Sequence, residues 1–456
     1  MGTAFERVPA DPLARAHLTL TSARLAALVR SRRITIAPMP ARLAEPGISL
    51  VIPSRNGKEL LAAQMPGIAR ELPAEAEIIV VDNGSQDGTV EWLRANWPRV
   101  EVAVSEAPLS FAEAVNRGIG RARRSKICLL NNDMLLDAGF FTALAHAFET
   151  VPDLFSATAQ IRFPEGVRRE ETGKAVMAQS APGDFPVRCD EPIAGEDLTY
   201  VLYGSGGCSL FDAAKLRALG GVDESYAPAY VEDLDLGFRA WQRGWPSVYV
   251  AGAVVEHRHR ATTSRYYTAE QLETILERNY LKFLARAVFD ASLFRRLWAQ
   301  AIRRLRLKAA RQILREAAGI ALAGGPRRRP PYSEALILAL TNGTVSVFPG
   351  RAPAGRPRVL VVSPDLRPCE RTEHDQVLVA FCAGPGAPPA HLLDACVEVV
   401  LVRSIGGESS MSLRAALQQT VRKWQPATVQ LVSNEMALYA TDCAPAKVIL
   451  MKDEAS

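Results

Sequence analysis

Short apolar runs rich in β-branched residues alternate with helical periods from residue 48 onward. The runs predict strands at Ile48–Ile52, Glu77–Val81, Val100–Val104 and Lys126–Leu130. The segments between them predict helices at about Lys58–Arg70, Thr89–Asn96 and Phe111–Ala122. Ser110 followed by Glu113 is a capping-box pattern at the start of the last of these helices. This alternation predicts an α/β domain with a mixed, mainly parallel sheet.

The pattern changes twice further along the chain. Residues 155–203 carry Pro, Gly and mixed charges, which favours hairpins and loops, and a long helical period at 269–289 closes the first domain. A second α/β pattern then begins, with strands predicted at Arg358–Ser363, Gln376–Phe381, Glu398–Arg403, Thr428–Val432 and Lys447–Met451 and a helix at Ser412–Trp424. Its length suits half of a doubly wound domain.

The chain therefore divides into four predicted parts. Residues 1–47 are an N-terminal extension and linker, and 48–290 form the first α/β domain. Residues 291–357 are a basic amphipathic helical connector and linker, and 358–456 form an incomplete Rossmann-like domain.

The composition excludes several classes of protein. The 456 residues are 48% hydrophobic with a net charge of only +5, so charge alone does not indicate a nucleic-acid partner. Seven cysteines without a C-x-x-C pair indicate neither a disulfide framework nor a structural zinc site. Charged residues interrupt the start of the chain, and the longest charge-free run after the basic stretch at 291–330, residues 335–350, is too short to span a bilayer. The prediction is a cytoplasmic protein without a transmembrane segment.

Charge is concentrated in the connector, where residues 291–330 carry eleven basic side chains and one acidic one. On a helix, one face would present Arg304, Lys308, Arg311 and Arg315. The simplest interpretation is a solvated face packed on its own domain. The alternative is peripheral contact with an anionic surface at the inner face of the plasma membrane.

Polar residues follow the ends of the predicted parallel strands, where ligands bind in open α/β sheets. Pro53 to Asn56 follow the first strand, and Asp82 ends the second. The fourth strand is followed by Asn131, Asn132 and Asp133, an oxygen-rich triplet suited to Mg²⁺ or Mn²⁺. The chain has no G-x-G-x-x-G after the first strand and no P-loop sequence, so neither a dehydrogenase nor a P-loop kinase is indicated.

A second group of candidates lies downstream. Residues 230–245 predict a helix with Glu232, Asp233 and Asp235 in its first turn, which suits either simple N-terminal capping or a general base at a cavity rim. His257 and His259 follow the next strand, and a neutral imidazole can ligate a metal.

In this order and spacing, the segments ISLVIPSRN, VVDNGSQDGT, AVNRGI, LLNND, GSGGCSLF, EDLD and VVEH resemble an inverting family 2 glycosyltransferase with the GT-A fold, rhamnosyltransferase-like. The resemblance covers about residues 48–290. It implies an enzyme of the hexosyltransferase type in bacterial polysaccharide biosynthesis, with a nucleotide-sugar donor, Mg²⁺ or Mn²⁺, and a glycan or polyprenyl-linked acceptor.

The resemblance also assigns residues to roles. The donor residues it implies are Pro53, Arg55, Asn56, Asp82, Asn116, Gly118 and Asn132. Gly206 and Gly207 would let backbone approach the sugar or acceptor, and the metal residues would be Asp133, Asn131 and His257, with His259 in reserve. Asp233 would be the catalytic base, with Glu232 and Asp235 shaping its site. Two departures from the family pattern stand out: Arg55 occupies a position that is commonly aromatic, and Asn131 replaces the first Asp of the D-x-D motif.

The implied reaction is a single displacement with inversion at the anomeric carbon. The last hundred residues resemble the N-terminal half of a family 4, GT-B type glycosyltransferase, without the half that would hold most donor contacts, so this part is predicted to be catalytically inert. A competing interpretation is a catalytically degenerate glycan-binding or scaffold protein.

Overall fold

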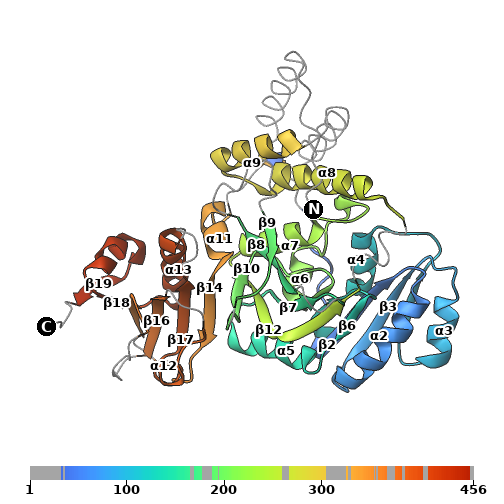
Figure 1. The fold of residues 1–456 in the computed structure, drawn as a ribbon, viewed down its shortest axis with the longest axis horizontal. Helices are drawn as coiled ribbons and strands as arrows, with labels where there is room; N and C mark the ends of the chain where they lie inside the picture. The colour runs from blue at the N-terminus through green and yellow to red at the C-terminus, as the bar shows by residue number, and fades with distance from the viewer. Residues whose placement is uncertain are drawn as a thin grey trace, which may run out of the picture.

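The computed structural model describes residues 32–33, 36–164, 169–176, 187–193, 195–258, 266–304, 325–326, 330–353, 355, 358–366, 375–382, 386–403 and 409–451. Figure 1 shows these residues as two α/β units side by side, with a helical layer above the first. His259, Lys308, Arg311 and Arg315 lie outside the described residues.

The first unit begins with the predicted parallel strands. They are β2 (Glu45–Ser54), β3 (Glu77–Asn83), β4 (Glu101–Ser105) and β5 (Arg124–Leu130), in the spatial order β4-β3-β2-β5. The crossover helices are α2 (Lys58–Glu71), α3 (Thr89–Asn96) and α4 (Phe111–Arg121). The capping box of Ser110 and Glu113 is confirmed. Alternate residues of β2 face opposite sides, so Leu50 packs with the α2 residues Leu61 and Met65 while Val51 packs with Val115 of α4.

The sheet then becomes mixed. Strand β11 (Cys208–Asp212) runs antiparallel between β5 and β7 (Ser156–Arg162), and β12 (Ser247–His257) runs parallel to β7. Short β6 (Met134–Leu136) pairs with the end of β12 in the register Met134 to His257. The predicted hairpin region supplies β8 (Arg169–Ala175), β9 (Val187–Asp190) and β10 (Thr199–Val201).

Helices complete this unit. They are α5 (Phe140–Thr150), α6 (Ala213–Ala218), η1 (Glu224–Tyr226), α7 (Glu232–Trp241), α8 (Ala269–Ala287) and α9 (Ala291–Arg304). A two-residue ladder pairs β1 (Arg32–Arg33) with β13 (Gly325–Pro326). On α9 the apolar residues Phe294, Leu297 and Trp298 are buried, whereas Arg295 and Arg296 are exposed. In the described part of the connector, the apolar face therefore packs on the protein.

The C-terminal unit contains five parallel strands in the order β17-β16-β15-β18-β19. This is the 3-2-1-4-5 order of a Rossmann-like sheet; the sequence predicted these strands but not their order. Its elements are β15 (Arg358–Ser363), β16 (Asp375–Cys382), α12 (Ala390–Ala395), β17 (Glu398–Arg403), α13 (Ser409–Trp424), β18 (Thr428–Val432), η3 (Glu435–Cys443) and β19 (Lys447–Met451).

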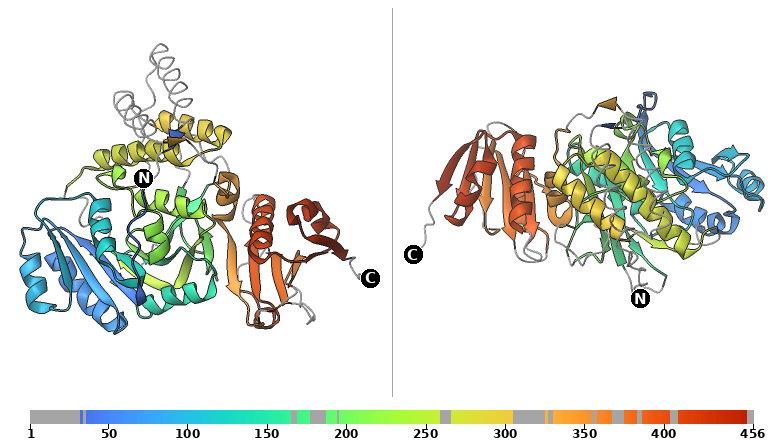
Figure 2. Two further views of the ribbon diagram at one scale, coloured as in Figure 1. Left: turned by 180° about the vertical axis from the view of Figure 1, so that it is seen from behind. Right: turned by 90° about the horizontal axis from the view of Figure 1, so that it is seen from above.

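The two units share one sheet. Residues 334–349, which the sequence places in the connector, form α11 (Glu334–Leu340) and β14 (Asn342–Pro349). Strand β14 pairs with β10 on one side and with β17 on the other, so the sheet continues without a break from the first unit into the second. Both views in Figure 2 show the C-terminal unit attached along this strand. Across the described residues, none of the helices combines the length and hydropathy needed to cross a bilayer.

Candidate active site

A cavity of about 320 Å³ lies beyond the carboxyl ends of β2 and β5. This is the place at which open α/β sheets bind ligands, and the volume falls in the range of small-molecule sites. The cavity lining includes Pro53, Arg55, Asn131, Asn132, Asp133, Gly206, Gly207, Glu232, Asp233 and His257, together with aromatic residues that the sequence did not single out. Residues spread over two hundred positions are thus brought to one place.

Asp133 and His257 form the first functional group of the cavity. Pairing of β6 with the end of β12 brings them together, and the Arg258 N–H donates to the Asp133 carbonyl at 3.0 Å. His257 Nε2 lies 3.5 Å from Asp133 Oδ2, while Asp133 Oδ1 is buried without a hydrogen-bond partner. A buried carboxylate oxygen with no protein donor is costly unless a ligand satisfies it.

The other members of the triplet hold this corner in place. Asn132 Nδ2 donates to Ser54 Oγ at 2.9 Å, and the Asn131 N–H donates to the Gly207 carbonyl at 2.9 Å. A Cβ on Gly207 would lie 2.5 Å from Asn131 Nδ2, so only glycine fits there. Gly206 and Gly207 both line the cavity.

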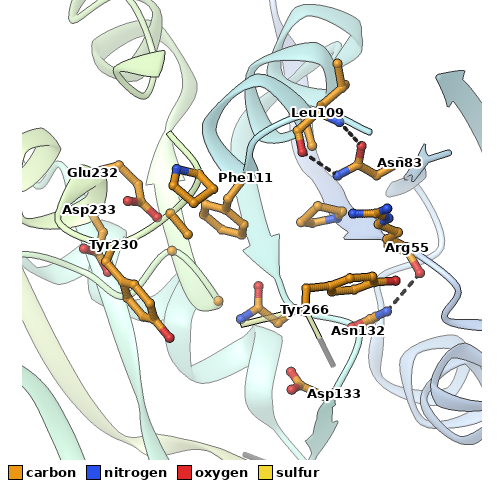
Figure 3. Close-up of a pocket in the computed structure, with 18 of the residues that line it drawn as sticks. Arg55, Asn83, Leu109, Phe111, Asn132, Asp133, Tyr230, Glu232, Asp233 and Tyr266 are labelled. Atoms are coloured by element: carbon orange, nitrogen blue, oxygen red, sulfur yellow. Dashed lines mark hydrogen bonds between the residues drawn. The ribbon is translucent and has the colours of Figure 1, made fainter. Parts of the chain in front are cut away.

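Glu232 and Asp233 form the second group, at the first turn of α7. They lie on one side of the cavity in Figure 3, opposite Arg55 and Tyr266. Asp233 Oδ1 accepts from its neighbour's N–H, that of Leu234, at 2.8 Å, and the Gly206 N–H also stabilises the Asp233 carboxylate. Glu232 Oε2 is buried without a partner. The positive end of the helix dipole favours negative charge here.

Burial sets the protonation of this pair. Burial raises the pKa of Asp233, and the N–H groups of Leu234 and Gly206 oppose that rise by stabilising the charged form. Burial and the adjacent Asp233 together raise the pKa of Glu232 to about 8. Both carboxyl groups therefore ionise less readily than exposed carboxyl groups, and the charge of Asp233 makes Glu232 harder to ionise.

Comparison with known proteins agrees with this geometry. Residues 46–272 match the family described as "Glycosyltransferase like family 2". This match covers 227 of the 456 residues and shows a similarity to that family. The predicted α/β fold with a mixed, mainly parallel sheet is confirmed, and the family match agrees with its GT-A assignment.

Curated relatives of this domain include named transferases. The chain is 29% identical over 220 residues to N-acetylglucosaminyl-diphospho-decaprenol L-rhamnosyltransferase of Mycobacterium tuberculosis, covering 43% of this chain and 71% of that protein. It is 26% identical over 236 residues to validoxylamine A glucosyltransferase of Streptomyces hygroscopicus subsp. limoneus, covering 46% of this chain and 51% of that protein. A match of 25% identity to an uncharacterized protein of Sinorhizobium fredii spans 26% of that protein's length. The chain thus covers from about a quarter to about seven tenths of these relatives.

Likeness to solved structures is distant. Mannosyltransferase PcManGT of Pyrobaculum calidifontis, in complex with GDP-Man and Mn²⁺, gives a TM-score of 0.40 at 16% identity over 69% of this chain and 85% of that chain.

The cavity also has an aromatic wall that sequence reasoning missed. Arg55 stands where an aromatic residue is common, but the ring of Tyr266 lies 4.2 Å from its guanidinium carbon, and Tyr266 Oη accepts from Asn56 Nδ2 at 3.0 Å. Arg55 Nε is buried without a partner. Stacking on an aromatic face is typical of guanidinium groups. The only sequence signal was the Tyr266–Tyr267 doublet directly before the capping box of Thr268 and Gln271.

Asp235 was predicted to shape the catalytic site, and the structure corrects this. Its carboxylate is fully buried away from the cavity, where Oδ2 accepts from Arg239 Nε at 2.6 Å and Oδ1 accepts from Tyr226 Oη at 3.2 Å. Arg286 Nη2 lies 3.6 Å from the same Oδ2. Asp235 therefore anchors α7 on α8 and makes no contact with the cavity.

Asn116 and Gly118 were predicted to lie beside the ribose and diphosphate, and they are not in the cavity lining. Asn116 Nδ2 donates to the Val222 carbonyl at 2.7 Å, and its Oδ1 accepts from the Val222 N–H at 2.9 Å. A Cβ on Gly118 would lie 2.2 Å from Val51 Cγ1. Both residues serve packing: Asn116 holds a loop, and Gly118 lets α4 approach β2.

Asp82 and Asn56 also lie behind the cavity wall. Asp82 is buried, with Oδ2 accepting from the Ser85 N–H at 3.2 Å and Oδ1 unpartnered. Asn56 ties the loop after β2 to the loop after β3, because its N–H donates to Ser85 Oγ and its Oδ1 accepts from the Gln86 N–H. Asn83, which sequence reasoning left out, lines the cavity instead and pins the backbone of Leu109.

The raised pKa of Glu232 makes a prediction about stability. Ionising Glu232 in the folded protein costs free energy, so the free energy of unfolding should fall as pH rises from about 4.5 toward about 8. Glu232→Gln removes this dependence and should lose less thermal stability than wild type between about pH 5 and about pH 9. Thermal unfolding of wild type and variant at about pH 5 and at about pH 9 measures this loss of stability. Glu59→Gln, at an exposed position of α2, is the control, and equal losses in all three proteins would contradict the prediction.

Proposed function

We propose that this chain is a metal-assisted, inverting glycosyltransferase that moves a hexosyl group from a nucleoside diphosphate sugar to a hydroxyl of a glycan or lipid-linked acceptor. The observation that carries the proposal is the presence of two different groups in one cavity. Asp133 and His257 suit the diphosphate end of a donor, and Glu232 with Asp233 suit proton removal from an acceptor.

Buried polar atoms support a charged ligand in this cavity. Asp133 Oδ1, Glu232 Oε2 and Arg55 Nε are buried without protein partners, and all three residues line the cavity. A buried polar atom without a partner is costly, and a bound ligand, ion or water would complete the bonding of these three atoms. A donor with a planar base, a diphosphate and a sugar matches this set, with the Arg55 and Tyr266 wall for the base.

The residues present fit a hard divalent cation. Asp133 supplies an anionic oxygen and His257 a nitrogen. The protein would supply only these few ligands, because the described residues contain no group of three or more His, Cys, Asp or Glu side chains that could hold a metal. Mg²⁺ and Mn²⁺ commonly take only one or two protein ligands when a substrate diphosphate supplies others. When bound, the cation would stabilise the negative charge of the departing diphosphate.

The chain's own residues would carry the remaining chemistry. The Asp233 carboxylate accepts the proton of the acceptor hydroxyl as that oxygen attacks the anomeric carbon from the face opposite the diphosphate, and the bond to the diphosphate breaks in the same step. The configuration therefore inverts, and no covalent enzyme intermediate forms. The backbone at Gly206 and Gly207 lets the sugar approach closely, and positioning supplies much of the rate.

A lipid-linked acceptor remains part of the proposal. One relative's name includes a decaprenol-linked substrate. The exposed Arg295 and Arg296 of α9 would attract anionic head groups through charge alone, because the apolar side of this helix is buried. Peripheral attachment at the inner face of the plasma membrane is proposed on this basis.

The proposal is tested by titrating the purified chain with a panel of nucleoside diphosphates and nucleoside diphosphate sugars, with Mg²⁺ or Mn²⁺ and then with chelator. We expect selective binding that chelator weakens, and the preferred base then fixes the donor for transfer assays. Binding to glycan with no affinity for any nucleotide would support the degenerate scaffold instead.

A further inference from the structure

The backbone just before the catalytic pair is strained. Tyr230 and Val231 have φ angles of +76° and +78°, a left-handed conformation in two consecutive non-glycine residues. Such a conformation is a genuine outlier for a β-branched residue such as Val231 and persists only where the surrounding structure holds it. Val231 is also the residue from which α7 starts, so this turn sets the direction in which Glu232 and Asp233 point.

One buried side chain holds this turn. Asn279, in the middle of α8, is fully buried, and its Nδ2 lies 2.6, 2.9 and 3.0 Å from the carbonyl oxygens of Tyr226, Ala229 and Tyr230, which share its two N–H donors. Its own Oδ1 has no partner. The side-chain amide therefore acts through its N–H groups. These hold the backbone carbonyl groups of the loop that ends in the left-handed residues Tyr230 and Val231.

Neighbouring residues of α8 hold the outer parts of the same loop. Arg278 Nη2 donates to the Ala227 carbonyl at 2.8 Å, and Lys282 Nζ donates to the Ser225 carbonyl at 2.9 Å. Of these donors, only Asn279 reaches Tyr230, the first residue of the strained pair. The loop also meets α4, because the Phe111 N–H donates to the Pro228 carbonyl at 3.0 Å.

We propose that Asn279 is a positioning residue for sugar transfer: by holding the Tyr226–Tyr230 backbone, it maintains the left-handed turn that directs Glu232 and Asp233 into the cavity. This inference rests on the proposed function for its kinetic consequences. The hydrogen bonds that join Asn279 to the turn do not depend on which reaction the protein catalyses. A strained turn persists only when the surrounding structure determines it, and the Asn279 amide contacts the carbonyl of Tyr230 directly.

The test replaces Asn279 with Leu, which has a similar size and no donor. We expect kcat to fall about 100-fold, as for a misplaced catalytic group, while the dissociation constant for the nucleoside diphosphate stays within about threefold of wild type. Retained nucleotide binding also shows that the variant folds. Lys282→Met, which removes a donor from the same helix to the outer part of the loop, is the matched control and should lower kcat by less than about threefold.

A second substitution tests the mechanism. Glycine adopts positive φ angles without strain, so adding Val231→Gly to Asn279→Leu should raise kcat above that of Asn279→Leu alone. Crystal structures of wild type and Asn279→Leu provide a measurement that needs no activity: Val231 should leave the left-handed region in the variant. A wild type without transfer activity would overturn the proposed function only. Unchanged turn geometry in Asn279→Leu, or an equal loss of kcat and nucleotide affinity, would overturn the positioning role.

Discussion

Asp233→Asn is expected to lower kcat by about 10²–10⁴-fold, the range for removing a general base. The amide keeps the size of the side chain and its place beside the Gly206 and Leu234 N–H groups, but it cannot accept the acceptor's proton. Binding of the donor nucleotide should change little, because the Asp133 and His257 group is intact. Steady-state kinetics with the donor identified by titration, combined with calorimetric nucleotide affinity, measure both quantities.

The same substitution has a second readout in Glu232. Without the neighbouring negative charge, the pKa of Glu232 should fall, since Asp233 is one of the two causes of its rise. Asp137→Asn, at an exposed residue paired with Arg162, is the matched control and should keep full activity. Full activity in Asp233→Asn would exclude Asp233 as the base and shift the role to Glu232.

Asp133→Ala is expected to weaken metal-dependent nucleoside diphosphate binding by at least about 100-fold. Even loss of a residue that only supports a metal ligand costs about 10–100-fold, and Asp133 would supply the site's one anionic oxygen. The measurement is calorimetric titration of wild type and variant, each with Mn²⁺ and with chelator. The four affinities form a cycle: the variant and wild type should differ with Mn²⁺ and agree with chelator. A difference of equal size in both conditions would show that Asp133 acts without a metal.

Most of the fold could be predicted from local pattern because buried parallel strands and amphipathic helices leave strong periodic signals. The strand ends at Leu130 and Ser363 were placed correctly for that reason. Strand β14 was not predicted because its sequence, Asn342–Pro349, mixes polar and apolar residues, and the side chains of Asn342 and Ser346 find partners that are distant in the sequence. Thr199 Oγ1 and Ser346 Oγ, for example, lie 2.8 Å apart, a contact that no local rule predicts.

In the candidate site, too, local sequence motifs located some residues and missed others. Motifs located Asp133, Asp233 and His257, because each stands at the end of a recognisable element. The motif could not separate Asp233 from Asp235, since successive helical residues turn by about 100° and two positions place the second carboxylate on the opposite side of α7. Tyr266 and Asn279 were missed because their partners, Arg55 and Tyr230, are remote in sequence and only the tertiary fold brings them together.

The strand shared by both units has a mechanical consequence. A hinge between the units would have to break a backbone ladder of β14, either with β10 or with β17, and a break at β17 would also remove the buried contacts of Asn342 with Ser412 and of Arg403 with Ser346. The shared sheet therefore opposes a swing of the C-terminal unit over the cavity. A ligand bound by the C-terminal unit would be held at a constant distance from Asp233. The unit would then influence transfer through that distance and not through its own movement.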